Sequence, residues 1–398
     1  MTKYDLCVVG GCGHVGLPLS IAFASKGLRV CIYDVNQDAL EIITRGNTPF
    51  LEEGADRLLK DTVGKTLFAT NNPKVISDAK FIIVVIGTPV DEHLNPEFTM
   101  MKKFFNNLLP YLRDGQHIIL RSTVFPGTTE KINEFFLKSK GLKVYVTFCP
   151  ERIAQGKAIE ELGTLPQIVS GFEDRSINEV SKLFKMLTKD IIILQPMEAE
   201  LAKLFTNTWR YIQFAIANQF YIIATSYGLD FYKIYEAMKY RYPRAKNFPP
   251  AGFAAGPCLF KDTMQLAAFN NNTFFLGHAA MLVNEGLPNF IVQRLKDKYS
   301  LKDKIVGILG MAFKANSDDK RESLSYKLKK ILEIEAKKVL CSDVYIHEEG
   351  FVSAQELIRN SDIIILGAPH KRYKKYQDLI SNKILVDVWN FFGKGGLF

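Results

Sequence analysis

The first regular pattern of the chain is the apolar run YDLCVV at residues 4–9, which GCGHVG follows at residues 11–16. A helical pattern continues to Lys26, Gly27 interrupts it, and a second apolar run leads to Asp34. This order of strand, glycine-rich turn, helix and strand with a terminal acid predicts a βαβ unit that binds a dinucleotide.

The glycine-rich turn suits a pyrophosphate because glycines allow a tight turn and a close approach of the backbone to the phosphates. The N-terminus of the following helix presents unpaired N–H groups to the same phosphates. An acid at position 34 is expected to accept hydrogen bonds from the ribose hydroxyls, which favours NAD over NADP. The predicted cofactor contacts in this unit are Gly11, Gly13, His14, Val15, Gly16 and Asp34.

Three further apolar runs, at 81–86, 118–120 and 144–146, each lead into a loop with a polar side chain. These side chains belong to Thr88, Thr123 and Glu151. Since the carboxyl ends of parallel strands share one edge of a sheet, we expect the three to face one crevice. Each is also open to the plainer interpretation of a helix cap or turn residue.

A long helical pattern with apolar spacing runs from Glu198 to about Gly228, as expected of a central helix that joins two domains. Lys203 and Asn207 are four residues apart and therefore project from one face of it. From the residues alone, the two are either surface residues or a polar site that faces a ligand.

The stretch FAAGPCLFKD at residues 253–262 places Cys258 directly after a glycine and a proline. Gly256 and Pro257 suit a tight turn that presents a thiol, and Lys261 and Asp262 could open a helix behind it. A second helical block is expected from Asp262 to about Lys298. A thiolate is the attacking form of cysteine, and a helix N-terminus favours it. The alternative is that Cys258 is a small buried apolar residue in a loop.

Apolar runs at 304–310, 339–341, 363–366 and 384–386, with helical segments between them, predict a second α/β domain of about ninety residues. The fold class is therefore α/β, with two Rossmann-like doubly wound domains joined by a central helical domain that contains the long helix.

The composition argues against several classes of protein. No apolar stretch of the 398-residue chain reaches the roughly 18 residues needed to span a bilayer, and no signal peptide is evident, so a cytoplasmic protein without membrane association is expected. Six scattered cysteines and six isolated histidines argue against a disulfide framework and against a metal site. The net charge of +9 comes without a nucleic-acid-binding motif, so we expect no nucleic-acid partner and attribute the basic balance to anionic small ligands.

Together these stretches resemble the UDP-glucose/GDP-mannose dehydrogenase family, the NAD-dependent nucleotide-sugar 6-dehydrogenases. The likeness covers nearly the whole chain, and the matching motifs occur in the order of the family. They are residues 11–16 with Asp34, residues 87–90, Ser122 and Thr123 with Pro126 and Gly127, residues 150–152, Lys203 with Asn207, residues 256–262, residues 311–314, and residues 321–323.

The resemblance implies three parts: an NAD-binding Rossmann domain at 1–196, a central helical dimerisation domain at 197–300, and a UDP-sugar-binding domain at 301–398. It also implies a homodimer or higher homo-oligomer, and a sugar C6 alcohol that is oxidised twice with two NAD⁺. Cys258 would capture the aldehyde as a thiohemiacetal, whose oxidation gives a thioester that water hydrolyses to the uronate.

By the same resemblance, Lys203 and Asn207 donate to the oxyanion, and Glu151 with Thr123 handles water. Asp262 shares proton transfer with Lys203 through a water. Arg321, Thr88 and Thr123 are the implied further contacts to NAD. The implied substrate contacts are Glu151, Arg152, Lys203, Asn207, Arg244, Phe253, Gly256, Phe313 and Lys314.

The chain departs from the usual family pattern of two glycines and then Ser or His before the cysteine, because Ala255, Gly256 and Pro257 stand there. The motif at residues 150–156 and the sequence at 242–244 look more like the UDP-N-acetylhexosamine branch than the UDP-glucose branch. We therefore expect a UDP-N-acetylhexosamine, such as UDP-N-acetylmannosamine, -glucosamine or -galactosamine.

The alternatives are a UDP-glucose 6-dehydrogenase, a two-electron β-hydroxyacid-type dehydrogenase, and a non-catalytic nucleotide-binding protein of the same fold. The second has no need of Cys258 or of the second α/β domain. Loss of Cys258, Lys203 or Glu151 would indicate the third, and all three are present.

Overall fold

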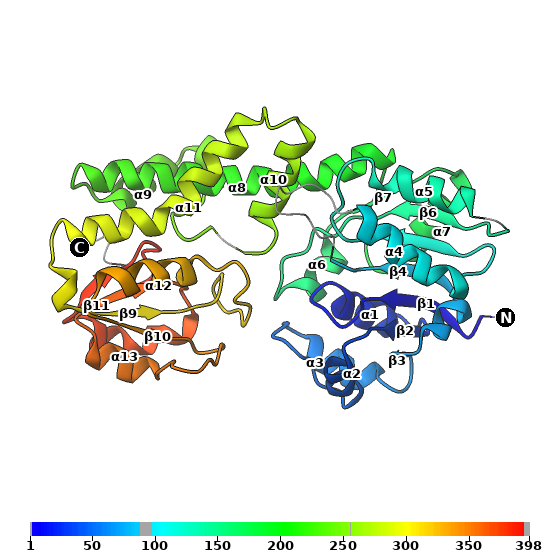
Figure 1. Ribbon diagram of the computed structural model, residues 1–398, viewed down its shortest axis with the longest axis horizontal. Helices are drawn as coiled ribbons and strands as arrows, with labels where there is room; N and C mark the ends of the chain where they lie inside the picture. Colours follow the sequence, from blue (N-terminus) through cyan, green and yellow to red (C-terminus); the bar gives the residue numbers. More distant parts are fainter. Residues whose placement is uncertain (1, 88–97, 140, 255, 394–398) are drawn as a thin grey trace. The chain divides into compact units, whose positions relative to one another are not determined.

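The computed structural model describes residues 2–87, 98–139, 141–254 and 256–393. Thr88, one of the predicted cofactor contacts, and Ala255, in the turn before Cys258, lie outside these residues. The chain divides into two compact units, Met1–Phe205 and Thr206–Phe398, and each is described by itself (Figure 1).

Unit 1 contains an eight-stranded sheet in the order β3-β2-β1-β4-β5-β6-β7-β8. Its first six strands follow the strand order of a dinucleotide-binding Rossmann fold, which confirms the predicted fold class. All described neighbours in the sheet are parallel except the antiparallel pair β6 and β7. The strands are β1 (Tyr4–Val9), β2 (Val30–Tyr33), β3 (Leu67–Thr70), β4 (Ala79–Val84), β5 (His117–Leu120), β6 (Tyr145–Phe148), β7 (Gln167–Gly171) and β8 (Ile191–Leu194).

Both faces of this sheet are buried because neighbouring side chains on a strand point to opposite sides. On β1, Leu6 and Val8 join one apolar core while Cys7 and Val9 join the other. Helices supply the remaining core residues on each face. They are α1 (Gly16–Ser25), α2 (Gln37–Thr44), α3 (Ala55–Thr62), α4 (Phe98–Leu108), α5 (Thr128–Lys138), α6 (Ala158–Thr164) and α7 (Asp174–Phe184).

The long helix α8 (Pro196–Ser226) has 31 residues and starts within two residues of the predicted position. Its first ten residues belong to unit 1 and the rest to unit 2.

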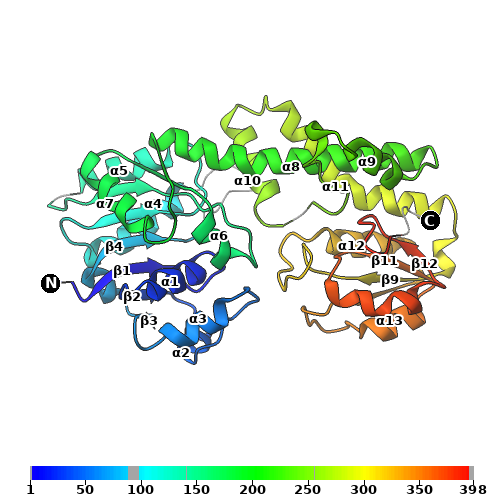
Figure 2. The ribbon, with the colours of Figure 1, turned by 180° about the vertical axis from the view of Figure 1, so that it is seen from behind.

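Unit 2 combines helices with a four-stranded parallel sheet in the order β10-β9-β11-β12. In both views α12 covers one face of this sheet and α13 the other (Figures 1 and 2). Leu324, Leu328 and Leu332 of α12 point into one core, and Leu357 and Ile358 of α13 into the other. The elements are α9 (Phe231–Lys239), α10 (Leu259–Phe269), α11 (Phe275–Lys296), β9 (Ile305–Leu309), α12 (Leu324–Glu335), β10 (Lys338–Ser342), α13 (Ala354–Asn360), β11 (Ile363–Leu366), α14 (Gln377–Ile380) and β12 (Ile384–Val386).

The prediction of one helical block from Asp262 to about Lys298 is wrong, because α10 ends at Phe269 and α11 begins at Phe275. Asn271 and Asn272 between them have φ angles of 52° and 57°. This left-handed conformation ends a helix, and asparagine is one of the few residues other than glycine that adopts it readily.

Candidate active site

The glycine-rich turn lies between β1 and α1, at the carboxyl edge of the sheet in unit 1. A Cβ at Gly11 would lie 2.9 Å from the carbonyl oxygen of Val8, and one at Gly16 would lie 2.6 Å from the Cα of Gly11. Both glycines are therefore required for close packing of the helix on the strand. A Cβ at Gly13 would meet nothing within 4 Å, so the turn leaves open space where a pyrophosphate would lie.

Asp34 follows β2 directly and lies beside this turn. Its Oδ2 accepts a hydrogen bond from the backbone N–H of Cys12 at 2.9 Å, and its Oδ1 accepts one from Asn36 at 3.0 Å. The half-buried carboxylate keeps lone pairs for further donors, as a ribose contact requires. The glycine turn and the acid together fit a dinucleotide such as NAD.

His14 and Val15, the other two predicted contacts in the turn, are half-buried. The His14 ring lies 3.9 Å from the ring of Phe50, measured between centroids, and within 3.2 Å of the amide nitrogen of Gln155. Gln155 belongs to the segment after β6, so this contact joins the glycine turn to the loop that carries Glu151.

Glu151 follows β6 and is buried, 7% exposed. Its Oε2 accepts a hydrogen bond from the guanidinium of Arg121, and its Oε1 accepts the backbone N–H groups of Arg152 and Ile153 at 2.6 and 2.7 Å. Arg121 also donates to the carbonyl of Cys149 at 3.2 Å. The carboxylate is thus fixed in orientation by its own loop and by a buried arginine.

Arg121 is a residue that the sequence analysis missed as a functional candidate. It precedes Thr123 in the loop after β5 and is only 1% exposed. An arginine after an apolar strand looks like a surface residue in the sequence, and no local signal reveals that Glu151 and Gln167 surround it. The half-buried Thr123 lies two residues further along this loop.

Lys203 is buried on α8. Glu200, one helical turn before it, is also buried and is a second residue that was not predicted from the sequence as a functional candidate. The Glu200 carboxylate accepts the backbone N–H groups of Gly127 and Thr129 at 2.6 and 2.8 Å, and the Thr129 hydroxyl at 2.6 Å. Burial raises the pKa of Glu200, against the lowering effect of these hydrogen bonds. Glu200 therefore joins the start of α8 to the N-terminus of α5 at the end of the Thr123 loop.

In unit 2, Cys258 is exposed and occupies the N-cap position of α10. The preceding Gly256 has a φ of 106°, which a side chain rarely adopts, and its N–H donates to the carbonyl of Glu322 at 3.2 Å. A Cβ there would lie 2.6 Å from the Phe313 ring. The structure thus brings Gly256 and Phe313 together, two residues before Cys258 in the chain.

Asp262 lies one turn into α10 and is 1% exposed. Its Oδ2 accepts a hydrogen bond of 2.6 Å from the side-chain amide of Asn207 on α8. This contact links the helix that follows Cys258 to α8. Sharing of protons between Asp262 and Lys203 stays a prediction.

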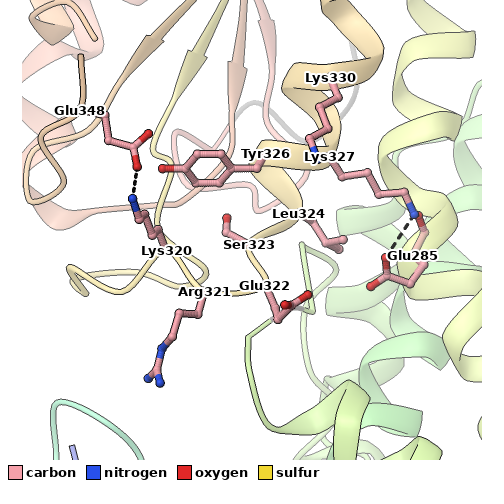
Figure 3. Close-up of a pocket in the computed structure, with 10 residues that line it drawn as sticks. All are labelled: Glu285, Lys320, Arg321, Glu322, Ser323, Leu324, Tyr326, Lys327, Lys330 and Glu348. Carbon is pink, nitrogen blue, oxygen red and sulfur yellow. Dashed lines mark hydrogen bonds and ion pairs between the residues drawn. The ribbon is translucent and has the colours of Figure 1, made fainter. Parts of the chain in front are cut away.

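Arg321 lines a hollow of about 540 Å³ in unit 2, together with residues of α11, α12 and the loop before α12 (Figure 3). Its guanidinium binds the carboxylate of Asp319, and this hydrogen bond raises the pKa of Arg321. In the same hollow Lys320 pairs with Glu348, and Lys327 with Glu285. Figure 3 shows the Arg321 side chain extending away from these pairs.

The remaining predicted substrate contacts belong to both units: Arg152 to unit 1, and Arg244, Phe253 and Lys314 to unit 2. Arg152 is half-buried and donates to the carbonyl of Pro166, and Arg244 is exposed with its guanidinium over the ring of Tyr242. Phe253 is buried, and its ring packs in a T-shaped arrangement with Trp389, with 6.4 Å between the ring centroids. Lys314 lies over the ring of Phe313, with 5.6 Å between its Nζ and the ring centroid.

Within the described ranges of the chain, no helix is long and apolar enough to cross a membrane. These ranges also contain no group of three or more His, Cys, Asp or Glu side chains that could hold a metal ion.

Comparison with known proteins gives matches along nearly the whole chain. Three domains of the UDP-glucose/GDP-mannose dehydrogenase family match: the NAD binding domain at residues 4–188, the central domain at 197–285 and the UDP binding domain at 307–394.

Among curated relatives, the UDP-N-acetyl-D-mannosamine dehydrogenase of Methanococcus vannielii is 30% identical, with 97% of this chain and 92% of the relative covered. The enzyme of the same name from Pyrococcus horikoshii is 29% identical, with 96% and 94% covered. The solved structure of the UDP-D-ManNAc dehydrogenase from P. horikoshii superposes with a TM-score of 0.89 at 27% identity, with 99% of this chain and 97% of that chain covered.

A solved UDP-glucose dehydrogenase from Pyrobaculum islandicum has the same fold, with a TM-score of 0.87 at 24% identity and coverage of 97% and 94%. The chain belongs to the UDP-glucose/GDP-mannose dehydrogenase family, whose members are NAD-dependent oxidoreductases of nucleotide sugars.

Proposed function

We propose that this chain oxidises the C6 hydroxyl of a UDP-N-acetylhexosamine to the uronic acid, with UDP-N-acetylmannosamine as the first candidate. The observation that carries the reaction is the exposed Cys258 at the N-cap of α10, whose first turn is bound to Asn207 through Asp262. The substrate rests on the names of the full-length relatives, and on the N-acetylhexosamine character of residues 150–156.

The reaction needs two hydride transfers and one water. When bound, NAD⁺ would accept the hydride in each oxidation. The C6 alcohol first loses a hydride and a proton and becomes an aldehyde. The Cys258 thiolate adds to that aldehyde, forming a C–S bond and an oxyanion, which takes up a proton to give a thiohemiacetal. Loss of a second hydride and proton gives a thioester. Water then breaks the C–S bond and gives the carboxylate, a proton and the Cys258 thiol, which loses its own proton before the next turnover.

The neighbouring side chains have distinct roles in this scheme. Asn207 and Lys203 donate hydrogen bonds or charge to the oxyanion on C6. Asp262 orients the Asn207 amide through the 2.6 Å bond and accepts protons together with Lys203.

Glu151 and Thr123 hold the hydrolytic water. Arg121 supports this role, because the buried guanidinium fixes one oxygen of the Glu151 carboxylate while the other faces the backbone N–H groups.

We assign the NAD contacts to the glycine turn, Asp34, Thr88, Thr123 and Arg321. Phe313, Lys314, Arg152 and Arg244 contact the substrate, with Phe253 and Gly256 shaping the loop against it. The functional parts are 1–196, 197–300 and 301–398.

We further propose a dimer formed through α8, because apolar side chains recur along one stripe of this helix with large exposed areas. They are Trp209, Ile216, Phe220 and Ile223.

The experiment that tests the substrate is a comparison of kcat/KM for NADH formation across UDP-N-acetylmannosamine, UDP-N-acetylglucosamine, UDP-N-acetylgalactosamine and UDP-glucose. We expect an N-acetylated sugar to give the highest value, with UDP-N-acetylmannosamine first. A highest value with UDP-glucose would overturn the substrate and leave the thioester chemistry in place.

A further inference from the structure

Two buried asparagines in unit 2 form a hydrogen-bonded relay that the proposed chemistry does not use. Asn218 on α8 and Asn284 on α11 are both 0% exposed. The Asn284 amide nitrogen donates to the backbone carbonyl of Tyr211 at 3.1 Å, and the Asn218 amide nitrogen donates to Asn284 Oδ1 at 2.9 Å. Asn218 Oδ1 in turn accepts the backbone N–H of Gly252 at 2.9 Å.

The relay has one direction. Tyr211 offers an acceptor and Gly252 a donor, so each amide must present its nitrogen toward Tyr211 and its oxygen toward Gly252. Reversing one amide would place two acceptors or two donors face to face in a buried site, which is costly. The relay therefore fixes the orientation of Asn218.

Asn218 and Asn207 hold the two ends of the segment that carries Cys258. Asn207 binds Asp262 at its far end, and Asn218 binds Gly252 at its near end. The two asparagines are eleven residues apart, which is close to three helical turns, so they project from the same face of α8 about 16 Å apart.

The indole ring of Trp389 also packs against Gly252. A Cβ at Gly252 would collide with the six-membered ring of Trp389, so the indole packs directly on the glycine Cα. Gly252 is thus confined between an indole and a fixed amide. The backbone between Gly252 and Asp262 has its ends at defined positions on α8.

We propose that Asn218, oriented by Asn284, is a positioning residue for the nucleophile: it sets where Cys258 lies relative to Asn207 and Asp262. This inference rests on the proposed function of Cys258. A nucleophile displaced by about 1 Å loses up to a hundredfold in rate, so loss of the Gly252 anchor is expected to reduce kcat.

The first test compares Asn218→Ala and Asn284→Ala with Leu332→Ala, a buried core variant on α12 without a part in the relay. Each enzyme is assayed for its melting temperature, kcat, KM for the UDP-sugar, and rate of Cys258 alkylation by iodoacetamide. We expect both asparagine variants to lose about tenfold or more in kcat and to alkylate at altered rates. Leu332→Ala is expected to melt lower and to keep kcat within about twofold.

Asn218→Asp gives a second readout that a purely structural role would not produce. A protonated carboxyl group offers an acceptor to Gly252 and a donor to Asn284, as the amide does, whereas the ionised form has no donor. We therefore expect kcat of this variant, relative to the parent enzyme, to fall as pH rises through the pKa of the new carboxyl group. The parent enzyme keeps its amide at every pH.

Equal kcat losses in the asparagine variants and Leu332→Ala, or a pH-independent kcat ratio for Asn218→Asp, would overturn the positioning role. Failure of the proposed function has a different signature: Cys258→Ser would retain full turnover. The two failures are therefore distinguishable.

Discussion

At the scale of single residues, Cys258 differs from the other cysteines by exposure. The thiols of the other five, Cys7, Cys12, Cys31, Cys149 and Cys341, are buried. Burial raises the pKa of Cys31 to about 11 and that of Cys149 and Cys341 to about 12, and raises those of Cys7 and Cys12 as well. Thiol reagents at neutral pH should therefore react selectively with Cys258.

Cys258→Ser is expected to reduce steady-state NADH formation at least about a thousandfold, because a serine hydroxyl lacks the reactivity of the thiolate. Binding of NAD⁺, measured by calorimetry, should stay close to that of the parent enzyme because most predicted cofactor contacts lie in unit 1. Full turnover would contradict the covalent mechanism.

Glu151→Gln tests the proposed role of Glu151 in holding the hydrolytic water. The glutamine keeps an acceptor for the N–H groups of Arg152 and Ile153 and removes the base, so thioester hydrolysis should slow by about a hundredfold or more. Mass spectrometry should then detect the sugar acyl group on Cys258 during turnover. An enzyme that slows without accumulating this adduct would place Glu151 in an earlier step.

At the scale of elements, the strands of unit 1 contain a pH-sensitive packing contact. His117 on β5 is 1% exposed, and its ring stacks on Tyr145 of β6 with 5.0 Å between centroids. Burial lowers the pKa of His117 from its usual 6.5, against the opposing charge of Glu179.

The unfolded chain therefore binds a proton at His117 at a higher pH than the folded chain does. Stability is expected to decrease as pH falls through about 6.5 toward the lower folded pKa, by about 1.4 kcal/mol for each unit of pKa difference. His117→Phe should lack this pH dependence. Thermal unfolding of both proteins between pH 5 and 8 measures this difference. Parallel profiles of stability against pH would contradict the role of His117.

The helices and strands that were predicted from the sequence are those that depend on local sequence patterns. The apolar run of β1 and the glycine turn between residues 10 and 16 depend on neighbours in the chain, so they are visible without tertiary contacts. The break after Phe269 was missed because asparagines at 271 and 272 are compatible with both a helix and a left-handed turn. Apolar residues on both sides continued the helical pattern.

The site is less accessible to sequence reasoning than the elements. Cys258, Asn207 and Asp262 were predicted from a motif, whereas Arg121, Glu200 and Asn218 are polar residues that look exposed in the sequence. Their burial depends on partners 30, 71 and 34 residues away: Glu151, Thr129 and Gly252. Only the folded chain brings those partners together.

At the scale of the whole molecule, the apolar stripe on α8 predicts self-association. Trp209 and Ile223 are 59% and 48% exposed, which is unusual for large apolar side chains that recur on one helix. Trp209→Glu with Ile223→Glu should yield monomers in analytical ultracentrifugation, whereas the parent chain is expected to sediment as a dimer or larger. Ile334→Glu, at an 81% exposed position on α12, is the matched control and should not change the assembly. A monomeric parent chain would contradict the dimer.

The measurement that tests the central claim most directly is the number of NADH molecules formed for each UDP-sugar consumed. The account predicts two NADH for each UDP-N-acetylmannosamine, with the uronic acid as product and no free aldehyde, because Cys258 retains the intermediate until the second oxidation. One NADH per sugar, with an aldehyde or ketone released, would contradict the thioester mechanism and leave a two-electron dehydrogenase.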